Sequence, residues 1–239
     1  MSPFYLIVAA VVLTGAAIGV VVVRRGRMAA RAQMVAFTAA VNALPTGEYI
    51  PRSVVDEWKT RFADTITLAH GSKHAQFLPK PQRLQYARLR SDLRDIYAYV
   101  QQLNEAFVEE RLAADRTALD QGGKSPLTER QRRAVVVDEN NIFVVAGAGT
   151  GKTSTIVGKV DYLTRRGLAV PGQILVLAFG SKTAAELRDR FSQFPTAGAV
   201  EASTFHALGR RIIASVVGKA PTLSVYSEDD RALGQFISN

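Results

Sequence analysis

The 239-residue sequence has no cysteine and only three histidines, His70, His74 and His206. A disulfide scaffold, a thiol nucleophile and a cysteine-ligated zinc site are therefore excluded, and a histidine-rich metal centre is disfavoured. Internal repeats and low-complexity segments are also absent from the sequence. The 47% hydrophobic content, beside 21% charged residues, excludes a wholly disordered or fibrous chain.

Basic residues outnumber acidic ones, with 30 Lys and Arg against 21 Asp and Glu, which gives a formal charge of +9. This balance predicts an anionic partner, either nucleic acid or a membrane surface. Residues 24–123 hold 15 basic and 11 acidic residues, and residues 124–239 hold 15 and 10. The excess is spread over both halves, so no polybasic tail explains it.

The longest apolar run, FYLIVAAVVLTGAAIGVVVV at 4–23, has about the twenty residues that a bilayer core requires. Three arginines follow between 24 and 27. The positive-inside rule then predicts a single-pass anchor in the inner or cell membrane, with the C-terminal portion cytoplasmic. A cleaved signal peptide would need the reverse charge order, and a buried core helix is the other alternative. The spacing of Gly15 and Gly19 predicts weak self-association of such helices.

The region that follows the basic residues is mostly helical by its pattern. Ser53 is expected to cap one helix, and an apolar stripe at spacings of three and four predicts one long helix over 83–119. No residue here suggests chemistry, so a packing or coiled arm is the interpretation. A turn-rich stretch at 121–126 marks its end.

Short apolar runs at 142–146 and 174–179 alternate with helical stretches after this boundary. Such alternation predicts an α/β fold, a partial RecA-like P-loop domain whose parallel sheet has flanking helices. We therefore expect three parts: an N-terminal transmembrane anchor (1–27), a helical region or arm (28–122), and an incomplete ATP-binding domain (123–239).

The sequence AGAGTGKT follows the first of these apolar runs and matches the phosphate-loop pattern, except that alanine replaces its first glycine. Glycines let backbone N–H groups converge on phosphate oxygens, and the following helix N-terminus adds partial positive charge. Lys152 would reach the β- and γ-phosphates, and the Thr153 hydroxyl would bind Mg²⁺. A glycine-rich turn that binds nothing is the alternative. The predicted loop comprises Ala146, Gly147, Ala148, Gly149, Thr150, Gly151, Lys152 and Thr153.

Two acidic clusters could be mistaken for a magnesium-binding strand. Val135-Val136-Val137-Asp138-Glu139 lies before the phosphate loop, at the end of a helix starting near Thr128, and is interpreted as a coincidence. The second cluster, 228–230, follows a poor candidate strand and is interpreted as a solvated turn.

Four segments together resemble UvrD/Rep-type superfamily 1 DNA helicases, in the order and spacing of that family. LTERQRRAV at 127–135 resembles its Q-motif and AGAGTGKT its motif I. ILVLAFGSKTAAE at 174–186 resembles motif Ia, and ASTFHAL at 202–208 resembles the Thr-Phe-His motif. The last two are most similar to the helicase IV branch of the family.

This resemblance implies ATP and Mg²⁺ as cofactors and single-stranded and double-stranded DNA as partners. Gln131 would read the adenine edge and Phe179 would stack on a base. From the residues alone, Phe179 could equally belong to a core and His206 could be structural. Ser154 stands where an arginine often packs on adenine. The remaining DNA contacts implied are Ser181, Lys182, Thr204, Phe205 and His206.

The implied function is that of the N-terminal part of an ATP-dependent 3′–5′ DNA helicase. The sequence ends before an acidic magnesium motif and a second motor domain, so this part alone is not expected to turn ATP over. One alternative is a membrane-tethered, non-catalytic module that binds nucleotide or DNA. A P-loop enzyme acting on a small molecule, such as a kinase, is disfavoured by the segments at 179–182 and 204–206.

Overall fold

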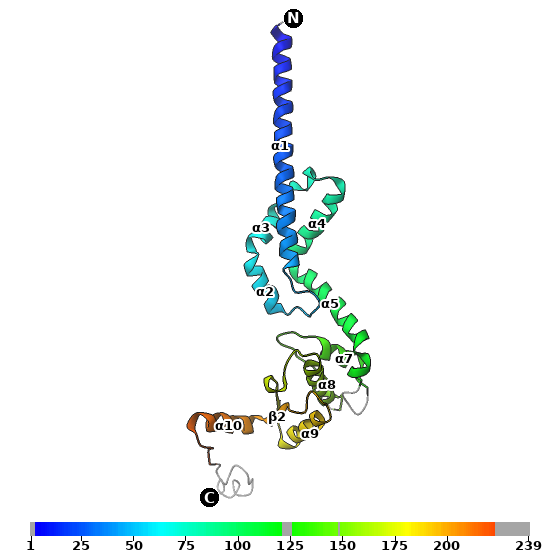
Figure 1. Ribbon diagram of the computed structural model, residues 1–239, viewed down its shortest axis with the longest axis vertical. Helices are drawn as coiled ribbons and strands as arrows, with labels where there is room; N and C mark the ends of the chain where they lie inside the picture. Colours follow the sequence, from blue (N-terminus) through cyan, green and yellow to red (C-terminus); the bar gives the residue numbers. More distant parts are fainter. Residues whose placement is uncertain (1–2, 121–125, 148, 223–239) are drawn as a thin grey trace. The chain divides into compact units, whose positions relative to one another are not determined.

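The computed structural model describes residues 3–120, 126–147 and 149–222, with side chains from residue 14 onward. Its contacts divide the chain into two compact units (Figure 1). The first, here called the helical unit, comprises Met1–Arg116 and Val136–Val145. The second, here called the sheet unit, comprises Thr117–Val135 and Ala146–Asn239. Each unit is described by itself.

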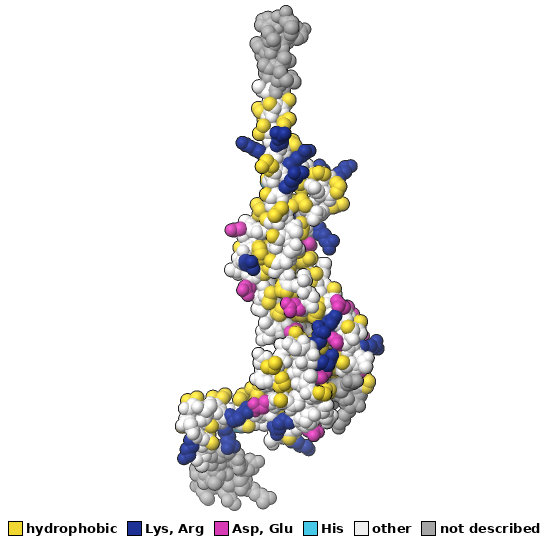
Figure 2. Space-filling model, in the orientation of Figure 1, with side chains coloured by type: hydrophobic (Ala, Val, Ile, Leu, Met, Phe, Trp, Pro, Cys, Tyr) yellow, Lys and Arg dark blue, Asp and Glu magenta, His cyan; other side chains and the backbone are white. Residues whose placement is uncertain are grey.

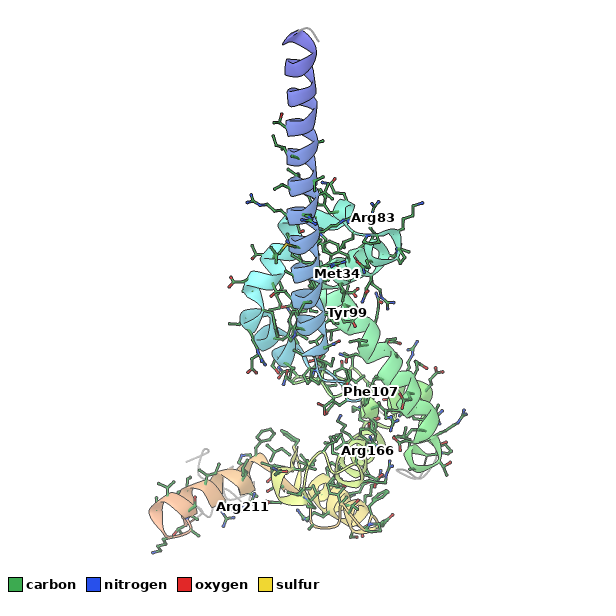
Figure 3. All side chains as sticks on the ribbon, turned by 45° about the horizontal axis from the view of Figure 1, so that its top comes forward. Met34, Arg83, Tyr99, Phe107, Arg166 and Arg211 are labelled. Carbon is green, nitrogen blue, oxygen red and sulfur yellow. The ribbon has the colours of Figure 1, made fainter. Side chains whose placement is uncertain are left out.

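The helical unit is built around the long helix α1, against which α3, α4 and the 3₁₀ helix η1 pack. Met34 of α1 and Tyr99 of α5 lie against its core (Figure 3). The buried side chains recur at helical spacing on each helix, which is how one apolar stripe per helix builds a shared core. The elements are α1 (Pro3–Asn42), α2 (Arg52–Arg61), α3 (Ala63–Gly71), η1 (His74–Phe77), α4 (Lys80–Arg94) and α5 (Ile96–Ala114).

The predicted membrane anchor is wrong. In the described part of the chain, no helix has both the length and the apolarity needed to cross a bilayer. Helix α1 continues without a break from the apolar run through the arginines to Asn42, and Ala30, Phe37 and Ala40 of its second half are buried in the core. The predicted single-pass membrane location is therefore also wrong. Gly15 and Gly19 lie in α1, and no observation supports the predicted association through them.

The predicted long helix over 83–119 is divided into α4, α5 and the short α6 (Arg116–Leu119). The first break is at Asp95, whose backbone leaves the helical region at φ −128° and ψ 68°. Its carboxylate accepts a hydrogen bond from the Ala98 N–H at 3.2 Å. Aspartate competes for backbone donors in this way and therefore starts a new helix.

Gly26 lies at the closest approach between α1 and η1. A Cβ added there would overlap the ring of Phe77, so only glycine allows the two elements to pack this closely. A buried polar network joins the same elements farther along α1. The Gln33 Oε1 accepts hydrogen bonds from the Ser72 hydroxyl and from the Tyr86 hydroxyl, each at 2.6 Å. Ser72 follows α3 directly, so the two contacts fix the connection between α3 and η1, and α4, against α1.

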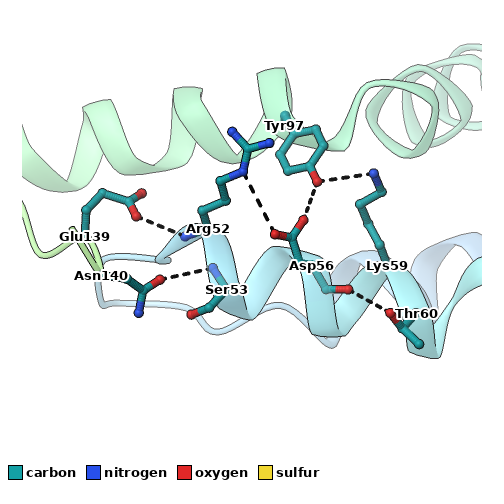
Figure 4. Close-up of polar contacts among 8 residues, drawn as sticks. All are labelled: Arg52, Ser53, Asp56, Lys59, Thr60, Tyr97, Glu139 and Asn140. Atoms are coloured by element: carbon teal, nitrogen blue, oxygen red, sulfur yellow. Dashed lines mark hydrogen bonds and ion pairs between the residues drawn. The ribbon is translucent and has the colours of Figure 1, made fainter.

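Helix α2 is capped by residues that are distant in the sequence (Figure 4). Ser53, expected to be its cap, makes no capping side-chain hydrogen bond, and Pro51 occupies the N-cap position. The Arg52 N–H donates to Glu139 Oε2 at 3.2 Å, and the Ser53 N–H donates to Asn140 Oδ1 at 3.2 Å. A carboxylate at a helix N-terminus also interacts favourably with the helix dipole. The acidic pair that follows Val137 is thus part of a structural contact within the helical unit.

Substituting Glu139 with alanine should therefore destabilise the helical unit by about 0.5–2 kcal/mol, the usual effect of losing an N-terminal cap. The effect can be measured as a lower urea midpoint of helical circular dichroism. Glu57→Ala is the control, because Glu57 is exposed on the same helix and is not among the caps. Equal midpoints for the two variants would contradict a capping role.

The sheet unit contains two paired strands among its described residues. Strands β1 (Leu175–Ala178) and β2 (Glu201–Thr204) are parallel, with Leu175 opposite Glu201 and Ala178 opposite Thr204. Helix α9 packs against both strands, and Phe191, Leu187 and Ala184 bury its inner face. The other elements are α7 (Glu129–Val136), α8 (Lys152–Arg165), η2 (Pro171–Gln173), α9 (Ser181–Ser192) and α10 (Phe205–Val217).

The predicted fold class is wrong as stated, because the described chain is mostly helical and its sheet has two strands. The run at 174–179 forms β1, as predicted. The run at 142–146 does not form a strand, and Phe143 and Val145 are 91% and 85% exposed. An apolar run is stable as a parallel strand only when neighbouring strands and helices cover it. Among the described residues β1 and β2 pair with each other, and nothing pairs with 142–145.

Candidate functional site

The glycine-rich segment forms a tight turn that opens directly into α8. Gly149 and Gly151 have φ of +72° and +86°, a region that side chains other than glycine rarely adopt. Gly151 is the N-cap of α8, and a Cβ placed there would lie 2.5 Å from the Gln131 Nε2. The Thr150 hydroxyl donates to the Gly147 carbonyl at 2.8 Å and closes the turn. The conformation thus requires glycine at 149 and 151.

Lys152, the first residue of α8, turns back over this loop. Its ammonium donates to the Gly147 carbonyl at 2.6 Å and to the Ala146 carbonyl at 3.3 Å. The side chain is exposed, so the ammonium is open to solvent at the N-terminal end of a 14-residue helix. A positive charge beside unpaired helix N–H groups favours an anion.

Gln131 makes contacts that the sequence interpretation did not include. Its Oε1 accepts from the Thr128 N–H at 2.7 Å, and its own N–H donates to the Thr128 hydroxyl at 3.4 Å. These reciprocal bonds are a capping box at the start of α7, and its Thr-x-x-Gln signature was present in the sequence. The Gln131 Nε2 also donates to the Thr150 carbonyl at 2.8 Å. Gln131 thereby ties α7 to the glycine-rich turn, while its contact with adenine stays a prediction.

The structure describes only some of the other residues that were predicted to bind nucleotide. Thr153 and Ser154 are half-buried in the first turn of α8. Ala148 lies outside the described residues, as does the acidic cluster at 228–230. Magnesium binding by Thr153 therefore stays a prediction.

The parallel pairing brings the two other predicted segments to one edge of the sheet. Because Ala178 lies opposite Thr204, the chain leaves both strands at the same level. Phe179 follows directly after β1, and Phe205 follows directly after β2. Parallel strands end at one edge of a sheet, which is where α/β proteins bind ligands.

Both phenylalanines at this edge are exposed. Phe179 is 98% exposed and Phe205 is 64% exposed, whereas Phe191 on α9 is fully buried. The alternative that Phe179 belongs to the core is therefore wrong. Two exposed rings that follow paired strands offer apolar surface that a stacking ligand could cover.

Polar residues surround these rings at the N-termini of two helices. Ser181, Lys182 and His206 are exposed in the first turns of α9 and α10. Thr204 is the N-cap of α10, and its hydroxyl accepts from the Ala207 N–H at 3.2 Å. Its capping role was not predicted, although threonine before a helix is a common signal.

The described chain thus combines a glycine-rich turn at the start of α8 with the edge of a parallel sheet, where two phenylalanines are exposed. Residues 127–233 match the model of the UvrD/REP helicase N-terminal domain. This part of the chain is therefore similar to that domain, and the resemblance predicted from the four motifs is confirmed.

Individual helicases show the same similarity. The chain is 41% identical over 140 residues to DNA helicase IV of Escherichia coli (strain K12), which covers 59% of this chain and 20% of that protein. It is 37% identical over 119 residues to ATP-dependent DNA helicase UvrD1 of Mycobacterium leprae (strain TN), covering 46% of this chain and 15% of that protein. The chain thus spans about a fifth or less of the curated relatives it matches.

Proposed function

We propose that this chain is the N-terminal part of an ATP-dependent DNA helicase that moves 3′ to 5′. The glycine-rich turn would hold ATP with Mg²⁺, and the sheet edge would hold single-stranded DNA. The observation that carries the proposal is the register of β1 and β2. It places the residues of two separate helicase motifs, 179–182 and 204–206, at one exposed edge.

The sheet edge has the chemistry that single-stranded DNA requires. Stacking on exposed aromatic rings is tolerant of sequence, because every base has a π-face. The exposed Phe179 and Phe205 would supply stacking, while Lys182 and the N–H groups at the start of α9 would contact phosphates. This division of roles suits a motor that must move along any sequence.

The turn has the chemistry that a triphosphate requires. ATP would bind over the glycines, and its oxygens would replace the Gly147 and Ala146 carbonyls as acceptors for the Lys152 ammonium. The Thr153 hydroxyl would help to hold Mg²⁺, which would neutralise part of the phosphate charge. Gln131, already bonded to the loop at Thr150, would lie beside the nucleotide.

Two titrations of the 239-residue chain test the proposal. A fluorescent non-hydrolysable ATP analogue with Mg²⁺ should bind, and so should a labelled oligothymidine strand. Failure of both would contradict the proposal. Binding of either ligand, combined with a lack of ATP-dependent unwinding by a longer protein that contains this chain, would instead favour the non-catalytic binding module.

A further inference from the structure

The positive charge of the helical unit is concentrated in two stretches that are distant in the sequence. Residues 24–47 and 65–91 together contain nine Lys and Arg and no Asp or Glu. Their formal charge therefore equals the +9 of the whole chain. The acidic residues of the helical unit lie outside these stretches. Glu48 directly follows the first stretch, and Asp92 directly follows the second.

Folding brings the two stretches together. The Gly26–Phe77 approach places η1 beside the arginines of α1, and the Gln33–Tyr86 hydrogen bond places α4 against the next turns of α1. Figure 2 shows Lys and Arg side chains gathered around this end of the helical unit. We call this surface the basic surface and define it by Arg24, Arg25, Arg27 and Arg31 of α1 with Lys73, Lys80 and Arg83.

The charges of the basic surface are available to a ligand. All seven side chains are exposed, and none forms an ion pair within the part of the chain that the structure describes. Arg83, labelled in Figure 3, is also held in place, because its guanidinium donates to the Leu78 carbonyl at 2.7 Å and to the Gln76 carbonyl at 3.0 Å. Exposed, unpaired like charges repel one another unless an anion neutralises them.

We propose that the basic surface binds the phosphate backbone of duplex DNA. Five of its seven cationic residues are arginine, whose planar guanidinium pairs with phosphate through two hydrogen bonds. Arg24, Arg27 and Arg31 recur at spacings of three and four, so they form one stripe over two turns of α1. A stripe of separated charges suits a polymer with a repeating phosphate better than a single small anion.

The aromatic residues of the two stretches favour duplex over single-stranded DNA. Phe37 and Tyr86 are fully buried and Phe77 is half-buried against α1, so the two stretches expose no phenylalanine or tyrosine ring for stacking on a base. The basic surface thus differs from the sheet edge, where Phe179 and Phe205 are exposed. The choice of DNA rests on the proposed function, because a motor of this kind acts on duplex as well as single strands.

The test is the salt dependence of duplex binding by the 239-residue chain. The variant Arg24→Gln/Arg27→Gln/Arg31→Gln should reduce the slope of log K against log salt by about 3, since each phosphate contact contributes about 0.9. The control Arg52→Gln/Arg61→Gln/Arg116→Gln removes the same charge outside the surface and should leave the slope nearly unchanged. Equal slopes for the two variants would overturn the proposal. Circular dichroism should show the same helical content in both, because the substituted side chains are exposed.

Two further measurements separate this proposal from its rivals. Vesicles of phosphatidylcholine and phosphatidylserine should bind both variants alike. If the arginine variant of the basic surface lost vesicle binding while its duplex binding was unchanged, the surface would be assigned to lipid and the proposal overturned.

Lys152→Ala and Phe179→Ala should not change the duplex salt slope. If the chain binds neither nucleotide nor single strands, but the arginine variant still lowers the duplex slope, the proposed function fails and the basic surface stands.

Discussion

Replacing Lys152 with alanine should weaken binding of an ATP analogue by about tenfold to a hundredfold. A hydrogen bond to a charged group contributes about 1.5–3 kcal/mol. Because about 1.4 kcal/mol changes a dissociation constant tenfold, this range gives the expected loss of affinity. Lys152 is the ammonium nearest the carbonyls of the turn, at 2.6 Å from Gly147. Fluorescence titration with Mg²⁺ present measures the dissociation constant directly.

A matched control is available on the same unit. Lys219 is an exposed lysine beyond the end of α10, and Lys219→Ala should leave nucleotide affinity unchanged. If Lys152→Ala bound the analogue as tightly as the control, the glycine-rich turn would not be the nucleotide site. Single-stranded DNA binding without nucleotide should be alike in both variants, because the sheet edge is made by other elements.

Phe179→Ala should weaken binding of single-stranded DNA by about 1–3 kcal/mol, the usual contribution of one aromatic stacking contact. The loss should be the same for oligothymidine and for mixed sequences, since stacking does not read the base. The ring is 98% exposed, so its removal leaves no cavity and should not lower the unfolding midpoint. Fluorescence anisotropy of a labelled strand is the measurement.

Phe143→Ala provides the comparison for this variant. Phe143 is 91% exposed but belongs to the helical unit, whereas the sheet edge belongs to the sheet unit. Its removal tests whether any exposed phenylalanine contributes through nonspecific apolar contact. Similar losses in both variants would count against a stacking site, and so would an unchanged affinity for Phe179→Ala.

The elements that could be predicted from sequence are those specified by nearby residues. The strand predicted at 174–179 is β1, and the helix predicted after the glycine-rich turn is α8. In both, a local apolar pattern and a local turn agree with the final packing. The same applies to the sheet edge: once β1 and β2 are strands, parallel pairing alone brings residues 179–182 and 204–206 to the same side.

The predictions that failed depended on distant partners. Nothing near Glu139 in sequence indicates that it caps α2, since the hydrogen bond from the Arg52 N–H joins residues 87 positions apart. The run at 142–146 has the composition of a strand, but composition cannot supply the neighbouring strands that would cover it. The apolar start of α1 has the length predicted for a span, but the same helix continues into the core of the helical unit.

The close approach at Gly26 makes the arrangement of charges on the helical unit depend on a residue that has no charge. Any larger side chain there must displace the Phe77 ring, and with it the segment that carries Lys73 and Lys80. A substitution of Gly26 would therefore weaken the positive electrostatic potential of the basic surface, although it changes no ionisable group.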